Sequence, residues 1–220
     1  MPTKYRNTQL INNALESFFI DNVSITKTPF GYGKSLARSI KDSDVSLTMF
    51  GNKKSPSIAK ALEVGRMTKK GVSQYVPYAL IGTNVKSDLV NQAYEQANSI
   101  YDSLVKNKKK IKDINLNING ESIDEINDFI NQDTLNRYMS IIISALQKKG
   151  VTFKSITSTG QTGYAEAAIQ AGKNLKIPVN IIVGADLIHR TRESASNEDE
   201  TKRNIKNDSI SFWERFVNNP

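Results

Sequence analysis

The segment from Val151 to Asp186 constrains the fold of this chain most, because its residue types change in a strand, loop, helix, strand order. An apolar, β-prone run covers 151–156, and a loop of small residues covers 157–163. A run of helix formers, 164–175, then places its alanines on one face at helical spacing. A second apolar run, 179–183, closes the segment. This order predicts a βαβ unit with two parallel strands.

Helical and strand patterns also alternate in the rest of the chain. We predict helices over 5–20, 36–40, 57–67, 86–106, 123–130 and 134–148. We predict strands over 22–26, 45–50, 75–82 and 111–118, the last half exposed and closed by a turn at Asn119 and Gly120. The alternation predicts one α/β domain over 1–220, a Rossmann-like three-layer fold with a largely parallel sheet.

Two details of that fold follow from the apolar pattern. The runs 151–156 and 179–183 are nearly continuous in apolar residues, as expected where helices cover both faces of a sheet, so we predict neighbouring interior strands. Ile142 and Leu146 lie on the apolar stripe of the helix before the first run, so we predict both in the core. After Asp186 the chain becomes highly charged, and we predict for 187–220 a charged loop and an aromatic C-terminal helix.

Composition narrows the class of protein. The chain has 220 residues with no cysteine and one histidine, His189, which excludes disulfides, thiolate metal sites and multi-histidine sites. We therefore expect neither a metal nor another cofactor. No apolar run approaches the roughly 20 residues of a membrane helix, and the first residues have no apolar signal core. We expect a soluble cytoplasmic protein without a membrane partner.

The net charge of +8 leaves one partner class open. Part of the excess lies in a single short segment that contains Lys106, Lys108, Lys109, Lys110 and Lys112. A solvated helix end is the simplest interpretation of that segment. Binding to nucleic acid is the alternative, and it rests on charge alone, because no nucleic-acid-binding motif accompanies the lysines.

The best functional clue is the loop Ser158 to Gly163, which leads from a strand into a helix start. Backbone N–H groups at a helix start attract anions such as phosphate, and glycines at Gly160 and Gly163 would allow close approach. Three side chains could add hydrogen bonds to such a ligand: Thr159, Gln161 and Thr162. The alternative is a tight turn that binds nothing, since the third glycine of a dinucleotide fingerprint is missing.

The same loop resembles a known family. The string TSTGQTGYAEAAIQAGKNLKIPV is similar to the GGQTG-x-D-x-A-A opening of the SLOG superfamily of Rossmann-like proteins, in the branch known as molybdenum carriers with phage-encoded relatives. Gln161, Thr162 and Gly163 match; Thr159 stands in place of a glycine, and the family aspartate falls on Ala165, next to Glu166. Residues 200–209 are similar to the family's R-T-x-x-N-V-x-x-S-D. The resemblance implies a Rossmann-like fold and a nucleotide-like ligand.

Candidate catalytic groups flank the loop. Asp186 follows the second strand, where open α/β sheets place ligands, and could orient a ribose or act as a base. Glu166 lies in the first helical turn, where it could bind a ligand or merely favour the helix dipole. Arg190 could clamp a phosphate, and His189 could shuttle protons. A second loop, Gly31 to Ser35, ends in G-K-S but lacks the first glycine of a phosphate loop, so we expect an ordinary turn at a helix start.

These features support two functions. The first is a nucleotide- or nucleotide-derivative-binding protein that could hydrolyse an N-glycosidic or phosphate bond. That activity does not include the phosphoribohydrolase reaction known in the superfamily, since its P-G-G-x-G-T-x-x-E signature is absent. The second is a non-catalytic structural or assembly protein on the same scaffold, such as a phage virion or host-takeover component. Its partners would be copies of itself or a larger protein assembly.

Overall fold

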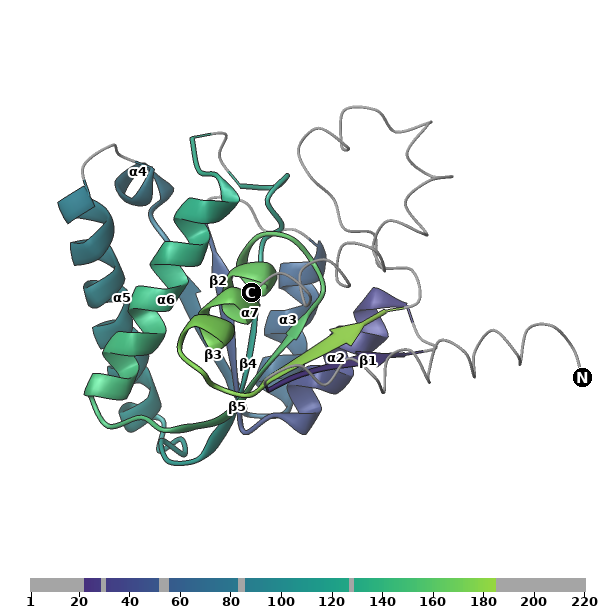
Figure 1. The fold of residues 1–220 in the computed structure, drawn as a ribbon. Helices are drawn as coiled ribbons and strands as arrows, with labels where there is room; N and C mark the ends of the chain where they lie inside the picture. The colour runs from purple at the N-terminus through teal and green to yellow at the C-terminus, as the bar shows by residue number, and fades with distance from the viewer. Residues whose placement is uncertain (1–21, 29–30, 52–55, 83–85, 127–128, 185–220) are drawn as a thin grey trace, which may run out of the picture.

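The computed structural model describes residues 22–28, 31–51, 56–82, 86–126 and 129–184 (Figure 1). The helix predicted over 5–20 and the charged and aromatic segment 187–220 lie outside the described residues. None of the described helices has both the length and the apolar character needed to cross a membrane.

Six strands form one sheet in which every neighbouring pair is parallel, in the order β1-β6-β5-β4-β2-β3. The strands are β1 (Val23–Lys27), β2 (Val45–Phe50), β3 (Gly71–Tyr75), β4 (Ile114–Gly120), β5 (Phe153–Thr159) and β6 (Val179–Val183). The two predicted strands of the βαβ unit pair with each other as β5 and β6, and each has a further neighbour. They are therefore interior strands, as predicted.

Helices cover both faces of this sheet (Figure 1). They are α2 (Tyr32–Asp42), α3 (Pro56–Met67), the short α4 (Tyr78–Ile81), α5 (Lys86–Lys106), α6 (Gln132–Lys148) and α7 (Tyr164–Asn174). α2 packs on α3 over one face, while α5, α6 and α7 stand side by side over the other. The predicted three-layer, Rossmann-like α/β fold is confirmed.

The main apolar core lies between the sheet and the layer α5, α6 and α7. Ile142 and Leu146 from α6 are both buried there, as predicted, beside Leu116 of β4 and Ile156 of β5. α6 can supply this stripe because its apolar residues recur at helical spacing. Asn131 accepts a bond from the Thr134 N–H at its start, and Gly150 adopts a positive φ of 88° just after its end.

Replacing Ile142 with alanine should lower the free energy of unfolding by about 2–5 kcal/mol, because the side chain is fully buried and its removal leaves a cavity. A urea melt measures the loss. Ile141, one residue earlier in α6, is only partly buried and is the matched control, so Ile141→Ala should cost clearly less. Equal costs for the two variants would mean that the buried face of α6 is assigned wrongly.

The opposite face of the sheet is polar, which corrects the expectation of strands that are apolar on both sides. A chain of hydrogen bonds crosses it from β1 to β2, beneath α2 and α3. Its links are Ser24 Oγ to Asn180 Oδ1 (2.6 Å), Asn180 Nδ2 to Thr157 Oγ1 (3.4 Å), Asn117 Nδ2 to the Thr157 carbonyl (3.3 Å) and Ser46 Oγ to Asn117 Oδ1 (3.0 Å). Buried polar groups are tolerated here because they bond to one another.

Three local predictions were wrong. The segment 75–82 is the end of β3 followed by α4, and the strand itself begins at Gly71. Asn119 and Gly120 complete β4 instead of forming a turn, and β4 is a central strand, not a half-exposed one. Within 123–130, the described residues form turns and no helix. The alternating asparagines of β4 misled the prediction, because they are buried in the polar chain of hydrogen bonds.

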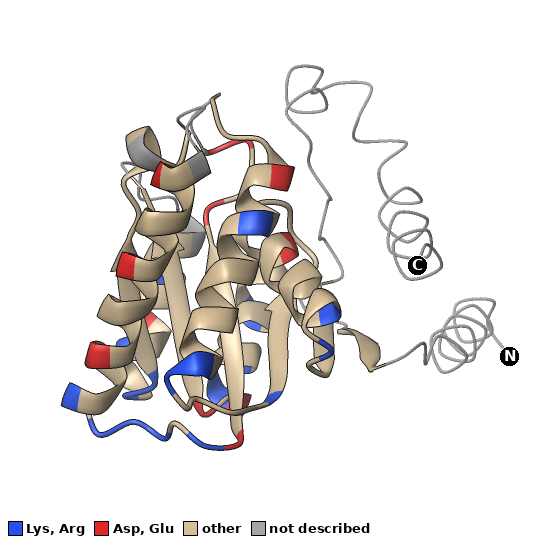
Figure 2. Cartoon of the chain, turned by 60° about the vertical axis from the view of Figure 1, so that its left-hand side comes forward, with Lys and Arg blue, Asp and Glu red and all other residues tan. Residues whose placement is uncertain are grey.

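All the strands run the same way, so the two ends of the sheet differ in character. The carboxyl ends of the strands lead into the starts of the helices, and the amino ends follow the ends of the helices. Figure 2 shows that lysine and arginine gather at the amino ends, in the last turns of the helices and in loops that follow them. The candidate site predicted from the sequence lies at the other, carboxyl edge.

Candidate functional site

The loop singled out in the sequence lies at the carboxyl edge of the sheet, between β5 and α7. β5 runs through Thr159, so the connecting turn is shorter than predicted and covers 160–163. The Thr159 side chain is buried at the end of the strand, whereas Gln161 is partly exposed. Thr162 and Gly163 are buried again where α7 begins. Of this loop, Gln161 is therefore the side chain best placed to meet a ligand.

The first turn of α2 lies against this loop, although the two are far apart in the sequence. The Tyr32 hydroxyl donates a hydrogen bond to Gln161 Oε1 at 2.6 Å. Burial raises the pKa of Tyr32 to about 12, and the nearby Thr159 side chain partly opposes the shift. At neutral pH the phenol thus keeps its proton and acts as a donor. Two loops that the sequence identified separately form one cluster.

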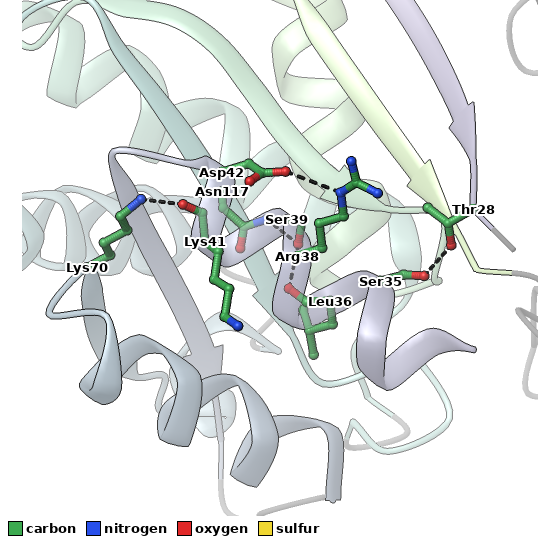
Figure 3. Close-up of polar contacts among 9 residues, drawn as sticks. All are labelled: Thr28, Ser35, Leu36, Arg38, Ser39, Lys41, Asp42, Lys70 and Asn117. Atoms are coloured by element: carbon green, nitrogen blue, oxygen red, sulfur yellow. Dashed lines mark hydrogen bonds and ion pairs between the residues drawn. The ribbon is translucent and has the colours of Figure 1, made fainter. Parts of the chain in front are cut away.

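The end of β1 holds α2 in this place. The hydroxyls of Thr28 and Ser35 lie 2.5 Å apart (Figure 3). The Thr28 N–H donates to the carbonyl of Val183 in β6. Within α2, the glycine of the G-K-S sequence, Gly33, faces open space. The G-K-S sequence starts a helix, as expected, and places Lys34 on the exposed surface at this edge.

The start of α7 is bonded within the chain itself. The Gly163 N–H donates to Gln132 Oε1 at 2.7 Å, and Gln132 Nε2 donates back to the Gly163 carbonyl at 2.9 Å. The next N–H, of Tyr164, donates to the carbonyl of Glu121 at 3.3 Å. Two of the backbone groups that an anion would use at this helix start are thus already bonded to α6 and to the segment after β4.

Sequence reasoning missed a buried carboxyl group, Glu121, which immediately follows β4. Its side chain is fully buried, and Oε2 accepts hydrogen bonds from the Gly51 N–H, at 2.7 Å, and from the Tyr78 hydroxyl. β2 and β4 are neighbours, but the chain leaves them in opposite directions, toward β3 and β5. Open α/β sheets usually bind ligands at such a point. The sequence signal for this residue is an acidic side chain directly after a strand. It was missed because the strand was predicted to end at 118, before Asn119 and Gly120.

Two tyrosine rings fill that point in this protein. Tyr78 and Tyr164 stack with ring centroids 6.4 Å apart and an interplanar angle of 20°. A side chain at Gly120 could not coexist with them, since its Cβ would lie 2.6 Å from the Tyr164 ring. Burial, and after it the bond to Glu121, raises the pKa of Tyr78, and burial likewise raises that of Tyr164. The usual ligand position between β2 and β4 is occupied by the chain's own side chains.

The remaining predicted residues divide into two groups. Glu166 lies in the first turn of α7, as predicted, with its side chain 8% exposed. Asp186, His189 and Arg190 lie outside the described residues. Among the residues that the structure describes, no group of three or more His, Asp or Glu side chains is arranged to hold a metal ion. A scan of protein-family models and a search of curated proteins both find no match to this chain.

Proposed function

We propose that this protein binds a nucleotide or nucleotide derivative at the carboxyl edge of β5, β6 and β1. The observation that carries the proposal is the hydrogen bond from Tyr32 to Gln161, which joins the first turn of α2 to the loop after β5. With Thr159 beside them, an amide and two hydroxyls converge at one edge. Such groups suit the oxygens of a phosphate or a ribose.

The location also supports the proposal. Open α/β sheets bind ligands at the carboxyl ends of their strands, and the tyrosine-filled point between β2 and β4 leaves the β5 side of this edge for a ligand. The positive end of the α2 dipole and Lys34 both favour an anion there. The SLOG resemblance of the Gln161-Thr162-Gly163 sequence points to the same ligand class.

Calorimetry with nucleoside mono-, di- and triphosphates and a dinucleotide tests the proposal. Wild type should bind at least one of them below millimolar concentration. Gln161→Ala should weaken binding about three- to tenfold, the equivalent of one hydrogen bond of roughly 0.5–1.5 kcal/mol. Gln170→Ala is the matched control, because Gln170 bonds to Asn174 along α7, away from the loop. Its affinity should equal that of wild type.

Hydrolysis is the second part of this proposal. Release of a free base or of phosphate from any bound nucleotide would establish it, and Asp186→Asn should then reduce turnover sharply if Asp186 is the base. If a bound nucleotide releases neither a free base nor phosphate, the function is restricted to binding.

A specific observation favours the non-catalytic alternative. The start of α7 is bonded to Gln132 and Glu121, so the protein itself occupies N–H groups that a phosphate would need. If wild type binds no member of the nucleotide panel at millimolar concentration, the nucleotide proposal fails. The fold would then act as a scaffold for protein assembly.

A further inference from the structure

The amino end of the sheet carries a dense and continuous group of cations, which we call the basic end. It comprises the last turns of α2, α3, α5, α6 and α7 and the loops from each of them to the second residue of the next strand. Its cations are Lys41, Arg66, Lys69, Lys70, Lys106, Lys108, Lys109, Lys110, Lys112, Lys148, Lys149, Lys154, Lys173 and Lys176 (Figure 2). The same described residues hold three carboxylates: Asp42, Asp44 and Asp113.

Contacts between the loops make this a single surface. The Lys109 ammonium donates to the carbonyl of Lys69, and the Lys70 ammonium donates to that of Lys41 (Figure 3). These bonds join the ends of α5, α3 and α2. The N–H of Thr152 donates to the Ile111 carbonyl at 3.0 Å, which joins the loops before β4 and β5. The loop between α7 and β6 lies at the same end, because all six strands are parallel. The lysines of the loops before β3, β4, β5 and β6 therefore belong to one face of the molecule.

Helix dipoles explain only part of this charge. A cation in the last turn favours the negative end of a helix, and each of the five helices has one: Lys41, Arg66, Lys106, Lys148 and Lys173. The other cations lie in the loops beyond the helix ends. Asp42 pairs with Arg38 at 3.5 Å and Asp44 with Lys110 at 3.5 Å, so two of the three carboxylates are already compensated.

The backbone conformation at three of these lysines is one that favours glycine. Four helices are followed, two residues after their last residue, by a residue with positive φ, the position that favours glycine. After α6 that residue is Gly150, but after α3, α5 and α7 it is Lys69, Lys108 and Lys176, with φ of 56°, 49° and 54°. A residue with a Cβ is unfavourable in this conformation. The chain thus places a cation at three helix ends where glycine would be the less strained residue.

We propose that the basic end binds the phosphodiester backbone of a nucleic acid without reading its bases. The helix ends and loops that carry the cations follow the strand order β6-β5-β4-β2-β3, a distance of about 19 Å at roughly 4.8 Å between strands. A duplex of that length carries about eleven phosphates on its two strands. The number of cations and the extent of the surface thus match a short stretch of duplex.

Side-chain chemistry favours a duplex over a single strand or a membrane. Single-strand sites stack bases on open aromatic rings, whereas the ammonium groups of Lys148 and Lys149 lie over the rings of Tyr94 and Tyr101, at 5.9 and 5.1 Å. The large exposed apolar residues in the described last turns are Met67 and Val105, on separate helices. Neither belongs to the continuous apolar face that a membrane-surface helix presents.

The test replaces the three positive-φ lysines in the full chain, as Lys69→Gly, Lys108→Gly and Lys176→Gly together. Binding to a labelled 20-base-pair duplex is followed by fluorescence anisotropy over a salt series. Wild type should bind in the range typical of non-specific sites, about 1–100 μM, and weaken steeply with salt. The triple variant should bind at least about tenfold more weakly at low salt, with a log–log salt slope shallower by about 3. Its melting temperature should be equal to or higher than that of wild type, because glycine relieves the positive-φ strain.

A second triple variant supplies the charge-matched control. Lys60→Gln, Lys86→Gln and Arg137→Gln remove the same charge from the first halves of α3, α5 and α6, away from the basic end. At 0.1 M salt, where charges more than about 10 Å away are screened, this control should bind the duplex within about threefold of wild type, whereas the first triple variant should still bind clearly more weakly. Equal losses in the two triple variants would overturn the proposal, as would absence of duplex binding by wild type at low salt. Tighter binding to phosphatidylserine vesicles than to the duplex would also overturn it, in favour of a membrane surface.

Discussion

Gly163→Ala should destabilise the protein by roughly 2–6 kcal/mol, although it adds a single methyl group. Gly163 has φ of 85° and ψ of −134°, a region that is nearly restricted to glycine and costs other residues about 1–3 kcal/mol. The new Cβ would also collide with the carbonyl oxygen of Glu121 and lie 2.9 Å from the backbone nitrogen of Ile123. Overpacking of this kind costs about 1–3 kcal/mol more.

The colliding atoms cannot easily move aside. They belong to the backbone after β4, where the buried side chain of Glu121 is bonded to Gly51 and Tyr78. Gly33→Ala is the control, because Gly33 faces open space at the first turn of α2 and alanine favours helix there. Urea melts of both variants should show a large loss for the first and no loss for the second. A loss below about 1 kcal/mol for Gly163→Ala would mean that the turn between β5 and α7 has another backbone conformation.

The second large effect is expected in alkali. Burial raises the pKa of the phenols of four tyrosines in the folded state, Tyr32, Tyr78, Tyr138 and Tyr164, whereas an unfolded tyrosine ionises near pH 10. Between those values the unfolded chain loses protons that the folded protein keeps, so stability falls as pH rises. The contribution of the protonated phenols to stability is fully present below pH 10 and is lost progressively as the pH rises above 10. Four such phenols give a slope of about 5 kcal/mol per pH unit between pH 10 and 12.

A protein with a typical stability of about 5–15 kcal/mol should therefore unfold within a few pH units above that point. Circular dichroism follows the unfolding, and absorbance at 295 nm follows phenol ionisation. Tyr138→Phe removes one of the four groups and should reduce the slope by about a quarter. If all four phenols ionised while the far-ultraviolet spectrum stayed native, their burial could not be the cause of alkaline unfolding.

The regular elements were predictable because their signals are local. The bounds of β2, α5 and β6 agree with the prediction, since apolar period and flanking turn residues specify each of them. β4 was misjudged because alternating asparagines indicate one solvent-facing side. Here those asparagines find partners on β2, on β5 and on α2, which only the assembled sheet provides.

The candidate site was predictable only in part, for a similar reason. The loop after β5 has a glycine and small-residue signature, so its place at the carboxyl edge followed from the sequence. Tyr32 belongs to a loop whose sequence predicts only an ordinary turn at a helix start. Its bond to Gln161 depends on the pairing of β1 with β6, which is not a local feature of the sequence. Glu121 had no motif of its own, because its significance comes from where β2 and β4 part.

The chain of hydrogen bonds on the sheet face beneath α2 and α3 has a consequence for the heat capacity of unfolding. Exposure of apolar surface raises the heat capacity on unfolding, and exposure of polar surface lowers it. Among the described residues, the large apolar core lies on the α5, α6 and α7 side of this sheet, whereas α2 meets the sheet through groups such as Ser39 and Asn117, whose side chains bond at 3.1 Å (Figure 3). The two helix layers thus contribute to stability with different temperature dependence. Cooling weakens the apolar layer and spares the hydrogen-bonded one, which flattens the curve of stability against temperature.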